Sequence, residues 1–132
     1  MRSRYSAFAL GLGAYLVETL AATHPDRGRP AAELARELGR AHLTQRYMGL
    51  TIVSARPDEV LFHARIFVQG RDQSFVELSS FVREAGGWRY AAGDLVPASA
   101  FGSELGALTR EGFLTHLKRA SAPAPPGPTL PR

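Results

Sequence analysis

The sequence predicts an α+β fold in which N-terminal helices pack against a curved antiparallel sheet. Apolar residues between positions 5 and 20 recur at spacings of three and four, which is the period of an amphipathic helix. After position 47 the pattern changes to alternation, over four segments that short turns separate. Helices followed by a run of strands are typical of α+β domains. A chain of 132 residues suits one domain with one core.

The first helical segment carries two glycines in its interior, Gly11 and Gly13. Each costs about 1 kcal/mol relative to alanine inside a helix, so we expect a kink or break and two helical pieces. The second piece must end by His24, because Pro25 disfavours helical geometry in the residue before it. A loop follows, then a short helix over residues 31–38, then a loop or short helix over residues 40–46.

The alternating half predicts an antiparallel meander of four strands, which Pro97 ends. The predicted strands cover residues 48–55, 60–69, 73–84 and 88–96, with a tight turn over residues 70–72. Apolar residues between positions 101 and 117 predict a C-terminal helical segment that folds back on the domain. Residues 120–132 are proline-rich without an apolar period, so we expect a disordered tail after a single domain of residues 1–119.

Alternation gives each strand two faces, and the face richer in aromatic residues should be the concave one, covered by the helices. The residues assigned to that face are Phe62, Ala64, Ile66, Phe75, Glu77, Ser79, Phe81, Trp88 and Tyr90. The opposite face carries His63 and Arg65, for which a solvated or dimer-facing position is expected. Core packing is the expected role of Trp88 and Tyr90, ahead of lining a pocket.

Glu77 is thereby placed in an apolar setting. A buried carboxylate must be paired or protonated, because the transfer of a lone charge out of water costs several kcal/mol. We therefore expect Glu77 to form an ion pair with Arg2 or Arg4, or to accept a hydrogen bond from Tyr5 or Tyr15.

Composition excludes several function classes. The sequence has no cysteine, and its four histidines form no pair at metal-ligand spacing, so neither a disulfide nor a bound metal is expected and no cofactor is predicted. No apolar run reaches 18 residues and no secretory signal is recognisable, which favours a cytoplasmic protein. The net charge of +4 comes almost entirely from arginines, but these are scattered, which argues against a nucleic-acid surface.

Short motifs in a fixed order show a resemblance to a known family. They are Arg2-Ser3-Arg4-Tyr5-Ser6-Ala7-Phe8, Tyr15-Leu16-x-x-Thr19, His24-Pro25, Gly49-Leu50-Thr51-Ile52, Phe62-x-Ala64-Arg65, Glu77-x-Ser79-x-Phe81 and Gly87-Trp88-x-Tyr90-x-x-Gly93-Asp94. Over about residues 1–94 the chain resembles the middle domain of the YchJ-like family of uncharacterised bacterial proteins.

The resemblance implies a nuclear-transport-factor-2-like fold, shared with SnoaL-like proteins, in which a curved sheet wraps helices into a cone with a pocket. It also implies a homodimer through the outer sheet face, which is common in this fold. Family members usually carry Cys-rich SEC-C motifs, which this chain lacks, and Ala92 stands where an aspartate is frequent. Because the opening motif is internal in relatives, we expect coding sequence for such a Cys-rich segment upstream of Met1.

Three functions remain open from the sequence. The first is a non-catalytic domain that binds a small molecule or a protein partner. The second is a small-molecule isomerase, dehydratase or hydrolase in which Glu77 acts as the general base, and the third is a basic protein associated with nucleic acid. The candidate pocket or motif residues are Arg2, Arg4, Tyr5, Tyr15, His24, Glu77, Ser79, Phe81, Trp88 and Tyr90. The opening arginines and Tyr5 are interpreted first as a structural lock on Glu77, and His24 as a helix-end residue that interacts with the dipole.

Overall fold

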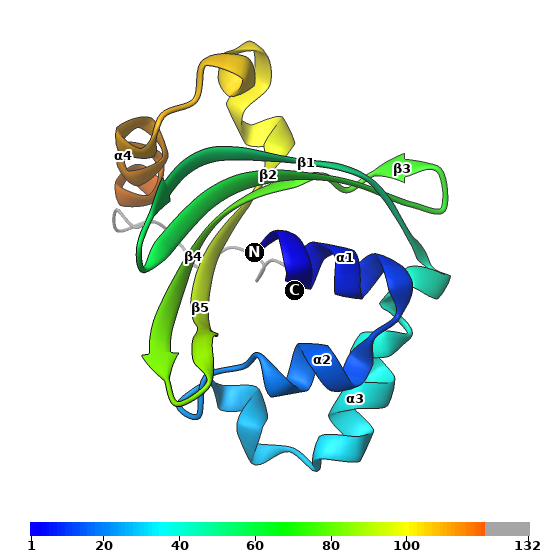
Figure 1. The fold of residues 1–132 in the computed structure, drawn as a ribbon. Helices are drawn as coiled ribbons and strands as arrows, with labels where there is room; N and C mark the ends of the chain where they lie inside the picture. The colour runs from blue at the N-terminus through cyan, green and yellow to red at the C-terminus, as the bar shows by residue number, and fades with distance from the viewer. Residues whose placement is uncertain (121–132) are drawn as a thin grey trace.

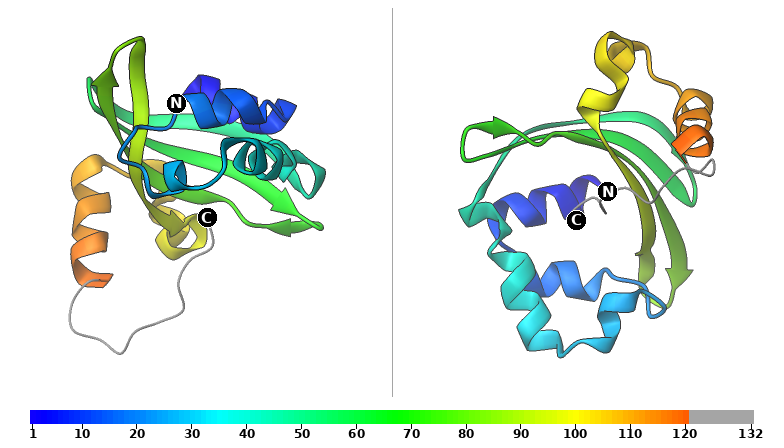
Figure 2. Two further views of the ribbon diagram at one scale, coloured as in Figure 1. Left: turned by 90° about the horizontal axis from the view of Figure 1, so that it is seen from below. Right: turned by 180° about the vertical axis from the view of Figure 1, so that it is seen from behind.

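A computed structural model describes residues 1–120 and has helices on both sides of one curved sheet (Figure 1). The N-terminal helical elements are α1 (Arg2–Leu10), α2 (Gly13–Glu18), the 3-10 helix η1 (Pro25–Gly28), α3 (Ala31–Gly39) and the 3-10 helix η2 (Ala41–Leu43). They lie on the concave side of the sheet, and the C-terminal elements lie on its convex side (Figure 2). The predicted α+β order of helices before strands is confirmed.

The first helical segment is broken where its glycines predicted. α1 ends at Leu10, and Gly11 adopts a left-handed conformation with φ 72°, from which its N–H reaches the carbonyls of Ala7 and Phe8. This is a common way to end a helix, and glycine adopts it without steric cost. Gly13 has a different role, because a β-carbon there would lie 1.8 Å from the carbonyl oxygen of Ala35 in α3. The break therefore lets α2 turn away from α1 and pack closely on α3.

The sheet is an antiparallel meander in the order β1-β2-β4-β5. Its long strands are β1 (Gln45–Arg56), β2 (Glu59–Val68), β4 (Phe75–Glu84) and β5 (Gly87–Pro97). Residues predicted as a tight turn also contain a two-residue strand, β3 (Arg71–Asp72), which pairs with the end of β2. The turn itself falls one residue earlier, at Gln69 and Gly70, whose φ values of 52° and 75° are left-handed.

The predicted concave face is the face that the N-terminal helices cover. Phe62, Ala64 and Ile66 of β2 form one buried cluster, against which Tyr5 of α1 packs. A second cluster joins Tyr90 of β5 to buried residues of the helical half; these are Val17, Leu20 and Leu34. Trp88 is a correction to the prediction, since it is 43% exposed instead of packed in the core. It is the second residue of β5, directly after the β4–β5 turn.

The convex face is covered in part by the end of the chain. The 3-10 segment η3 (Ala98–Ala107) and helix α4 (Arg110–Ala120) fold back, as the sequence predicts, and bury Phe101 and Phe113 against the sheet. The strand residues beneath them are Leu61, Val76, Leu78 and Val96. The homodimer expected through this face stays a prediction, and the structure places this chain's own residues over the apolar part of the face. The predicted tail lies outside the described residues, apart from Ala120, which ends α4.

A tyrosine joins α1 to an irregular point of the sheet edge. The register of β1 against β2 shifts between Tyr47 and Gly49, which is a β-bulge. The Gly49 N–H donates to the hydroxyl oxygen of Tyr5 at 2.8 Å, and the Tyr5 and Tyr47 rings meet edge-on with centroids 5.5 Å apart. Burial raises the pKa of Tyr47 to about 12. Tyr5 therefore satisfies a backbone donor of β1 and fixes α1 across the sheet.

The close packing of α2 on α3 gives a stability prediction. Gly13→Ala should lower the free energy of unfolding by about 2–3 kcal/mol, because the new methyl group must displace backbone atoms of Ala35. Denaturant unfolding followed by circular dichroism measures the change. Gly106→Ala is the matched control, since nothing lies within 4 Å of a β-carbon there. An equal and small effect of both substitutions would contradict the assigned role of Gly13.

Candidate functional site

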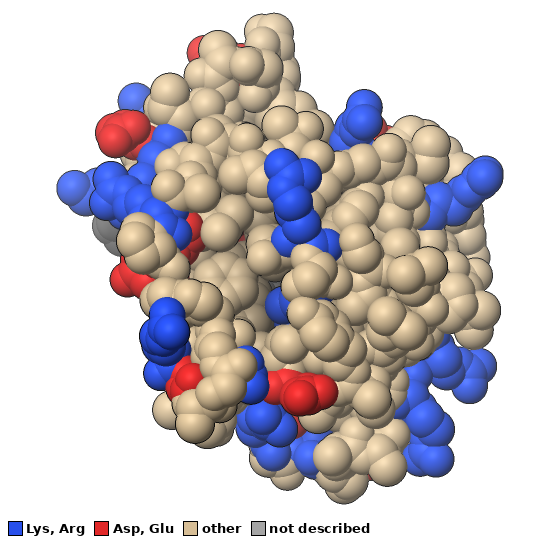
Figure 3. Space-filling model, in the orientation of Figure 1, with Lys and Arg blue, Asp and Glu red and all other residues tan. Residues whose placement is uncertain are grey.

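An open pocket of about 220 Å³ lies where α1 and α2 face the end of the sheet that carries the β1–β2 and β4–β5 turns. Its lining residues are Met1, Ser3, Arg4, Tyr15, Thr19, Pro57, Val60, Phe81, Trp88 and Tyr90. Figure 3 shows a hollow near the centre of this face, rimmed mainly by uncharged residues, with part of a basic side chain visible inside it. The pocket brings together segments from both halves of the chain.

The two walls of the pocket differ in chemistry. The helical wall supplies polar groups from Ser3, Arg4, Tyr15 and Thr19, of which the Tyr15 hydroxyl donates to Ser3 Oγ at 2.8 Å. The wall from the sheet and the β1–β2 turn is apolar and aromatic; its members are Pro57, Val60, Phe81, Trp88 and Tyr90. A few polar groups converging on an apolar surface are typical of small-molecule sites.

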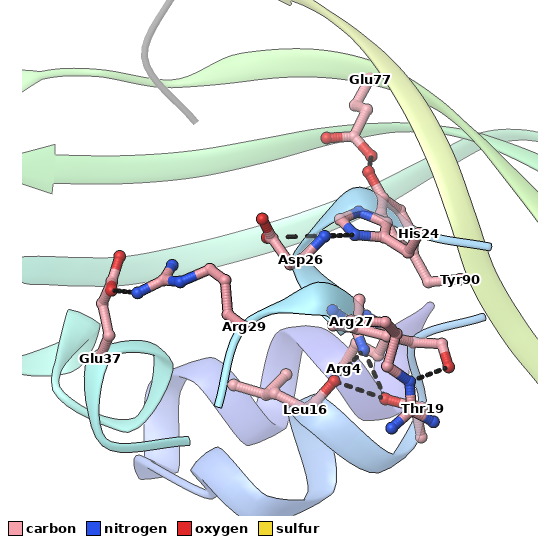
Figure 4. Close-up of polar contacts among 11 residues, drawn as sticks. Arg4, Leu16, Thr19, His24, Asp26, Arg27, Arg29, Glu37, Glu77 and Tyr90 are labelled. Carbon is pink, nitrogen blue, oxygen red and sulfur yellow. Dashed lines mark hydrogen bonds and ion pairs between the residues drawn. The ribbon is translucent and has the colours of Figure 1, made fainter. Parts of the chain in front are cut away.

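Arg4 is the buried cation of the polar wall, with 6% of its surface exposed. Its Nη1 donates to the Leu16 carbonyl oxygen at 2.9 Å and to Thr19 Oγ1 (Figure 4). Leu16 lies in the last turn of α2, where carbonyl groups lack partners within the helix. A cation at a helix C-terminus also interacts favourably with the helix dipole. The side chain thus ties α1 to the end of α2.

The remaining environment of Arg4 is aromatic, and one of its donors is unsatisfied. The guanidinium carbon lies 4.9 Å from the centroid of the Tyr90 ring and 5.9 Å from that of Phe8. Nε is buried and has no hydrogen-bond partner among the described residues. Burial lowers the pKa of the Arg4 guanidinium, and the nearby Tyr90 and Glu77 act in the opposite direction. Arg4 is therefore a fixed cation that still has hydrogen-bonding capacity.

Glu77 is buried, as predicted, and it accepts hydrogen bonds from two residues that were not named as its expected partners. It is 6% exposed, and its Oε2 accepts from Ser79 Oγ at 2.5 Å and from the Tyr90 hydroxyl at 2.8 Å. The Tyr5 and Tyr15 hydroxyls bind Gly49 and Ser3 instead. Arg4 and Glu77 contact the same residue, because the guanidinium lies over the Tyr90 ring and the carboxylate accepts from the Tyr90 hydroxyl.

Gly93 makes room for the contact between Glu77 and Tyr90. It lies directly opposite Ser79 in the β4–β5 ladder. A β-carbon at Gly93 would be 2.3 Å from Glu77 Oε2 and 2.4 Å from the Tyr90 hydroxyl oxygen. The glycine of the Gly93-Asp94 motif is thus explained by close side-chain packing, since its φ is not left-handed.

His24 lies beside this group in a different role from the one predicted. It precedes the 3-10 helix η1 as its N-cap, so it is not at the C-terminal end of a helix. Its Nδ1 accepts a hydrogen bond from the Asp26 N–H at 3.1 Å, so a neutral ring carries its proton on Nε2. The ring centroids of His24 and Tyr90 are 5.7 Å apart. In Figure 4 the imidazole stands next to the Tyr90 ring.

The structure divides the predicted site residues into three groups. Arg4, Tyr15, Phe81, Trp88 and Tyr90 line the pocket. Tyr5, His24, Glu77 and Ser79 are not among its lining residues, and Arg2 is exposed. The predicted site residues did not include five lining residues, Met1, Ser3, Thr19, Pro57 and Val60, although Ser3 and Thr19 lie within the family motifs. Val60 could have been found, because alternation places it on the face of Phe62, whereas the turn that presents Pro57 has no periodicity to reveal it.

The fold and the site define a small domain of the NTF2-like class, with its pocket between the helices and the sheet. A family model described as the YchJ middle NTF2-like domain matches residues 1–93. The chain belongs to the YchJ family, also named UPF0225.

Three relatives illustrate the similarity. The UPF0225 protein of Chromobacterium violaceum is 40% identical over 100 residues, which are 70% of this chain and 69% of that protein. That of Bordetella pertussis is 38% identical over 100 residues, covering 72% and 68%. The YchJ protein of Shigella dysenteriae is 34% identical over 99 residues, covering 70% and 62%. No solved structure matches the chain significantly.

Two further observations concern residues 1–120. In this range no three histidine, cysteine, aspartate or glutamate side chains are placed where they could hold a metal ion. No helix in the described part of the chain has both the length and the apolar character needed to cross a membrane.

The buried carboxylate gives the next prediction. Tyr90→Phe should lower the free energy of unfolding by about 1–3 kcal/mol, because Glu77 Oε2 loses one of its two observed donors in a buried setting. Tyr15→Phe removes an exposed hydroxyl contact and should change stability by less than about 0.5 kcal/mol. Denaturant unfolding of both variants measures the difference. Equal effects would show that Tyr90 contributes nothing through Glu77.

Proposed function

We propose that this domain binds a small molecule in the pocket between its helices and its sheet, and that binding rather than catalysis is its role. The observation that carries the proposal is the buried Arg4 in the pocket wall, with Nε unpartnered among the described residues. A buried donor without a partner costs about 1–3 kcal/mol. Such groups are rare in folded proteins and call for an explanation. An acceptor atom of a ligand would remove that cost.

The size and shape of the pocket support a small ligand. Pockets for drug-sized molecules measure roughly 300–1,000 Å³. This pocket measures about 220 Å³, so its ligand should be smaller than a drug-sized molecule. It is open to solvent on one side, so a ligand can enter without a large movement of the helices. Its apolar wall provides burial, and its polar wall provides orientation.

Catalysis by Glu77 has less support. A general base must come within about 2.6–3.2 Å of the group whose proton it removes, directly or through one water. Glu77 is not among the lining residues, and the Tyr90 ring that binds it is. A carboxylate that accepts two hydrogen bonds from neighbouring side chains is better suited to holding Tyr90 in place.

A nucleic-acid role has less support as well. Phosphate binding depends on several basic side chains that share one surface. Two of the arginines already form ion pairs on separate parts of the molecule, Arg29 with Glu37 and Arg110 with Glu59. Arg4 is buried in the pocket wall and cannot contribute to such a surface.

The test is a fragment screen by NMR on uniformly ¹⁵N-labelled protein. Fragments that bind should shift the signals of pocket residues, including the Trp88 indole N–H. Trp88→Ala should weaken these fragments by about tenfold, because an exposed aromatic ring of the apolar wall is lost. Val82→Ala is the matched control, since Val82 is similarly exposed, at 40%, but does not line the pocket.

Two results would contradict the proposal. One is a screen in which no fragment perturbs the pocket signals. The other is perturbation confined to the groove between η3 and α4, a separate cavity that Phe101, Leu108 and His116 line. Turnover of a bound fragment, abolished by Glu77→Gln, would favour the catalytic alternative over a purely binding role.

A further inference from the structure

We infer that the ligand of this pocket is a small carboxylic acid with a planar apolar body, whose carboxylate binds Arg4 and whose body lies along Phe81 and Trp88. The inference rests on the proposed function, and it adds the chemical class of the ligand. It follows from the orientation of the guanidinium, from the charges around the pocket, and from the aromatic residues of the opposite wall.

The orientation of Arg4 leaves one edge of its guanidinium available. Both hydrogen bonds that the described residues accept from Arg4 come from Nη1, which binds Leu16 and Thr19. The opposite edge carries Nε and Nη2, whose N–H groups point in parallel and match the two oxygens of a carboxylate. Nε has no partner among residues 1–120. Full use of this edge requires a small shift of the side chain, since Nε is buried.

The guanidinium is held close to its binding position before any ligand arrives. Nη1 is held by a helix-end carbonyl and a hydroxyl, and the plane of the group lies near the Tyr90 ring, whose hydroxyl is held by Glu77. A preorganised donor loses little conformational entropy on binding. Glu77 and Ser79 thereby act as positioning residues for the wall of the pocket.

The charges favour an anion. Arg4 is the one charged side chain among the lining residues, and none of them is an aspartate or glutamate. The nearby carboxylate, Glu77, already accepts hydrogen bonds from Ser79 and Tyr90. The helical wall also supplies the hydroxyls of Ser3, Tyr15 and Thr19, and Met1, Ser3 and Arg4 lie at the start of α1. Among these groups the planar fork of the guanidinium matches a carboxylate, and the experiment below compares a carboxylate with phosphate.

The opposite wall favours a planar apolar body. Phe81 and Tyr90 pack edge to face with centroids 5.9 Å apart, which leaves an aromatic surface in the pocket. Trp88 extends this surface, although it is 43% exposed. Aromatic rings prefer offset or edge-on contacts with other rings. At about 220 Å³ the pocket is smaller than the sites of drug-sized molecules, which favours a ligand with one ring and a short acid chain.

The experiment compares matched probes by NMR titration of the whole chain. We expect 3-phenylpropionate to bind at least about tenfold more tightly than the neutral 3-phenylpropionamide, because a charge-assisted bidentate contact is lost in the amide. Acetate, which lacks the apolar body, should bind at least tenfold more weakly than 3-phenylpropionate. Inorganic phosphate should not compete at equal concentration.

Two variants assign the contacts. Arg4→Lys keeps the charge and loses the planar fork, so it should reduce the preference for the acid over the amide to about threefold or less. Trp88→Ala should weaken acid and amide by the same factor, about tenfold, and leave the preference unchanged. Because Arg4 also supports the fold, Trp88→Ala keeps the test informative if Arg4→Lys does not fold.

The outcomes separate this inference from the proposed function. Equal affinity of acid and amide at the pocket would overturn the carboxylate and leave the proposed function standing, as would phosphate binding more tightly than the acid. The same holds if other fragments bind the pocket but 3-phenylpropionate does not. Absence of any pocket binding in the fragment screen would overturn both.

Discussion

Burial of two opposite charges around one tyrosine organises this domain. The Arg4 guanidinium lies over the face of the Tyr90 ring, and the Glu77 carboxylate accepts a hydrogen bond from the Tyr90 hydroxyl. Neither charge is stable in an apolar interior unless hydrogen bonds replace its hydration. Arg4 takes acceptors from α2 and Thr19, and Glu77 takes a second donor from Ser79. The acceptors of Arg4 lie in the helical half and the donors to Glu77 lie in the sheet, so Tyr90, which contacts both groups, is a point where the two halves meet.

The backbone reinforces the same point of contact. The Tyr90 N–H donates to the Thr19 carbonyl oxygen at 2.7 Å, and the Ala21 N–H donates to the Tyr90 carbonyl oxygen at 2.7 Å. The segment after α2 thus pairs with the edge of β5, an edge that would otherwise present unpaired groups. Gly93 completes the arrangement, because a larger residue would separate Glu77 from Tyr90. Backbone pairing, side-chain charge and glycine packing all favour the same docking of helices on sheet.

The two charges differ in how fully they are satisfied, and the proposed function depends on this difference. Glu77 has its observed hydrogen-bond donors within the sheet and does not line the pocket. Arg4 lines the pocket and keeps a buried Nε without a partner among the described residues. The opening motif is thus a structural lock between α1 and α2, and its Arg4 is also the cation on which the proposed ligand site depends.

Local sequence determined the elements of this fold and which way their side chains point. Gly11 and Gly13 break the first helix because their effect on helix stability is local, and alternation places Glu77 on the covered face because side-chain direction follows from strand geometry. The YchJ motifs were recognisable for the same reason, as they are contiguous patterns. Tertiary structure alone decided that Glu77 accepts hydrogen bonds from Ser79 and Tyr90, and that Trp88 is exposed. These depend on ångström-scale distances between segments far apart in the chain, and on where the helices stop covering the sheet, which no local pattern encodes.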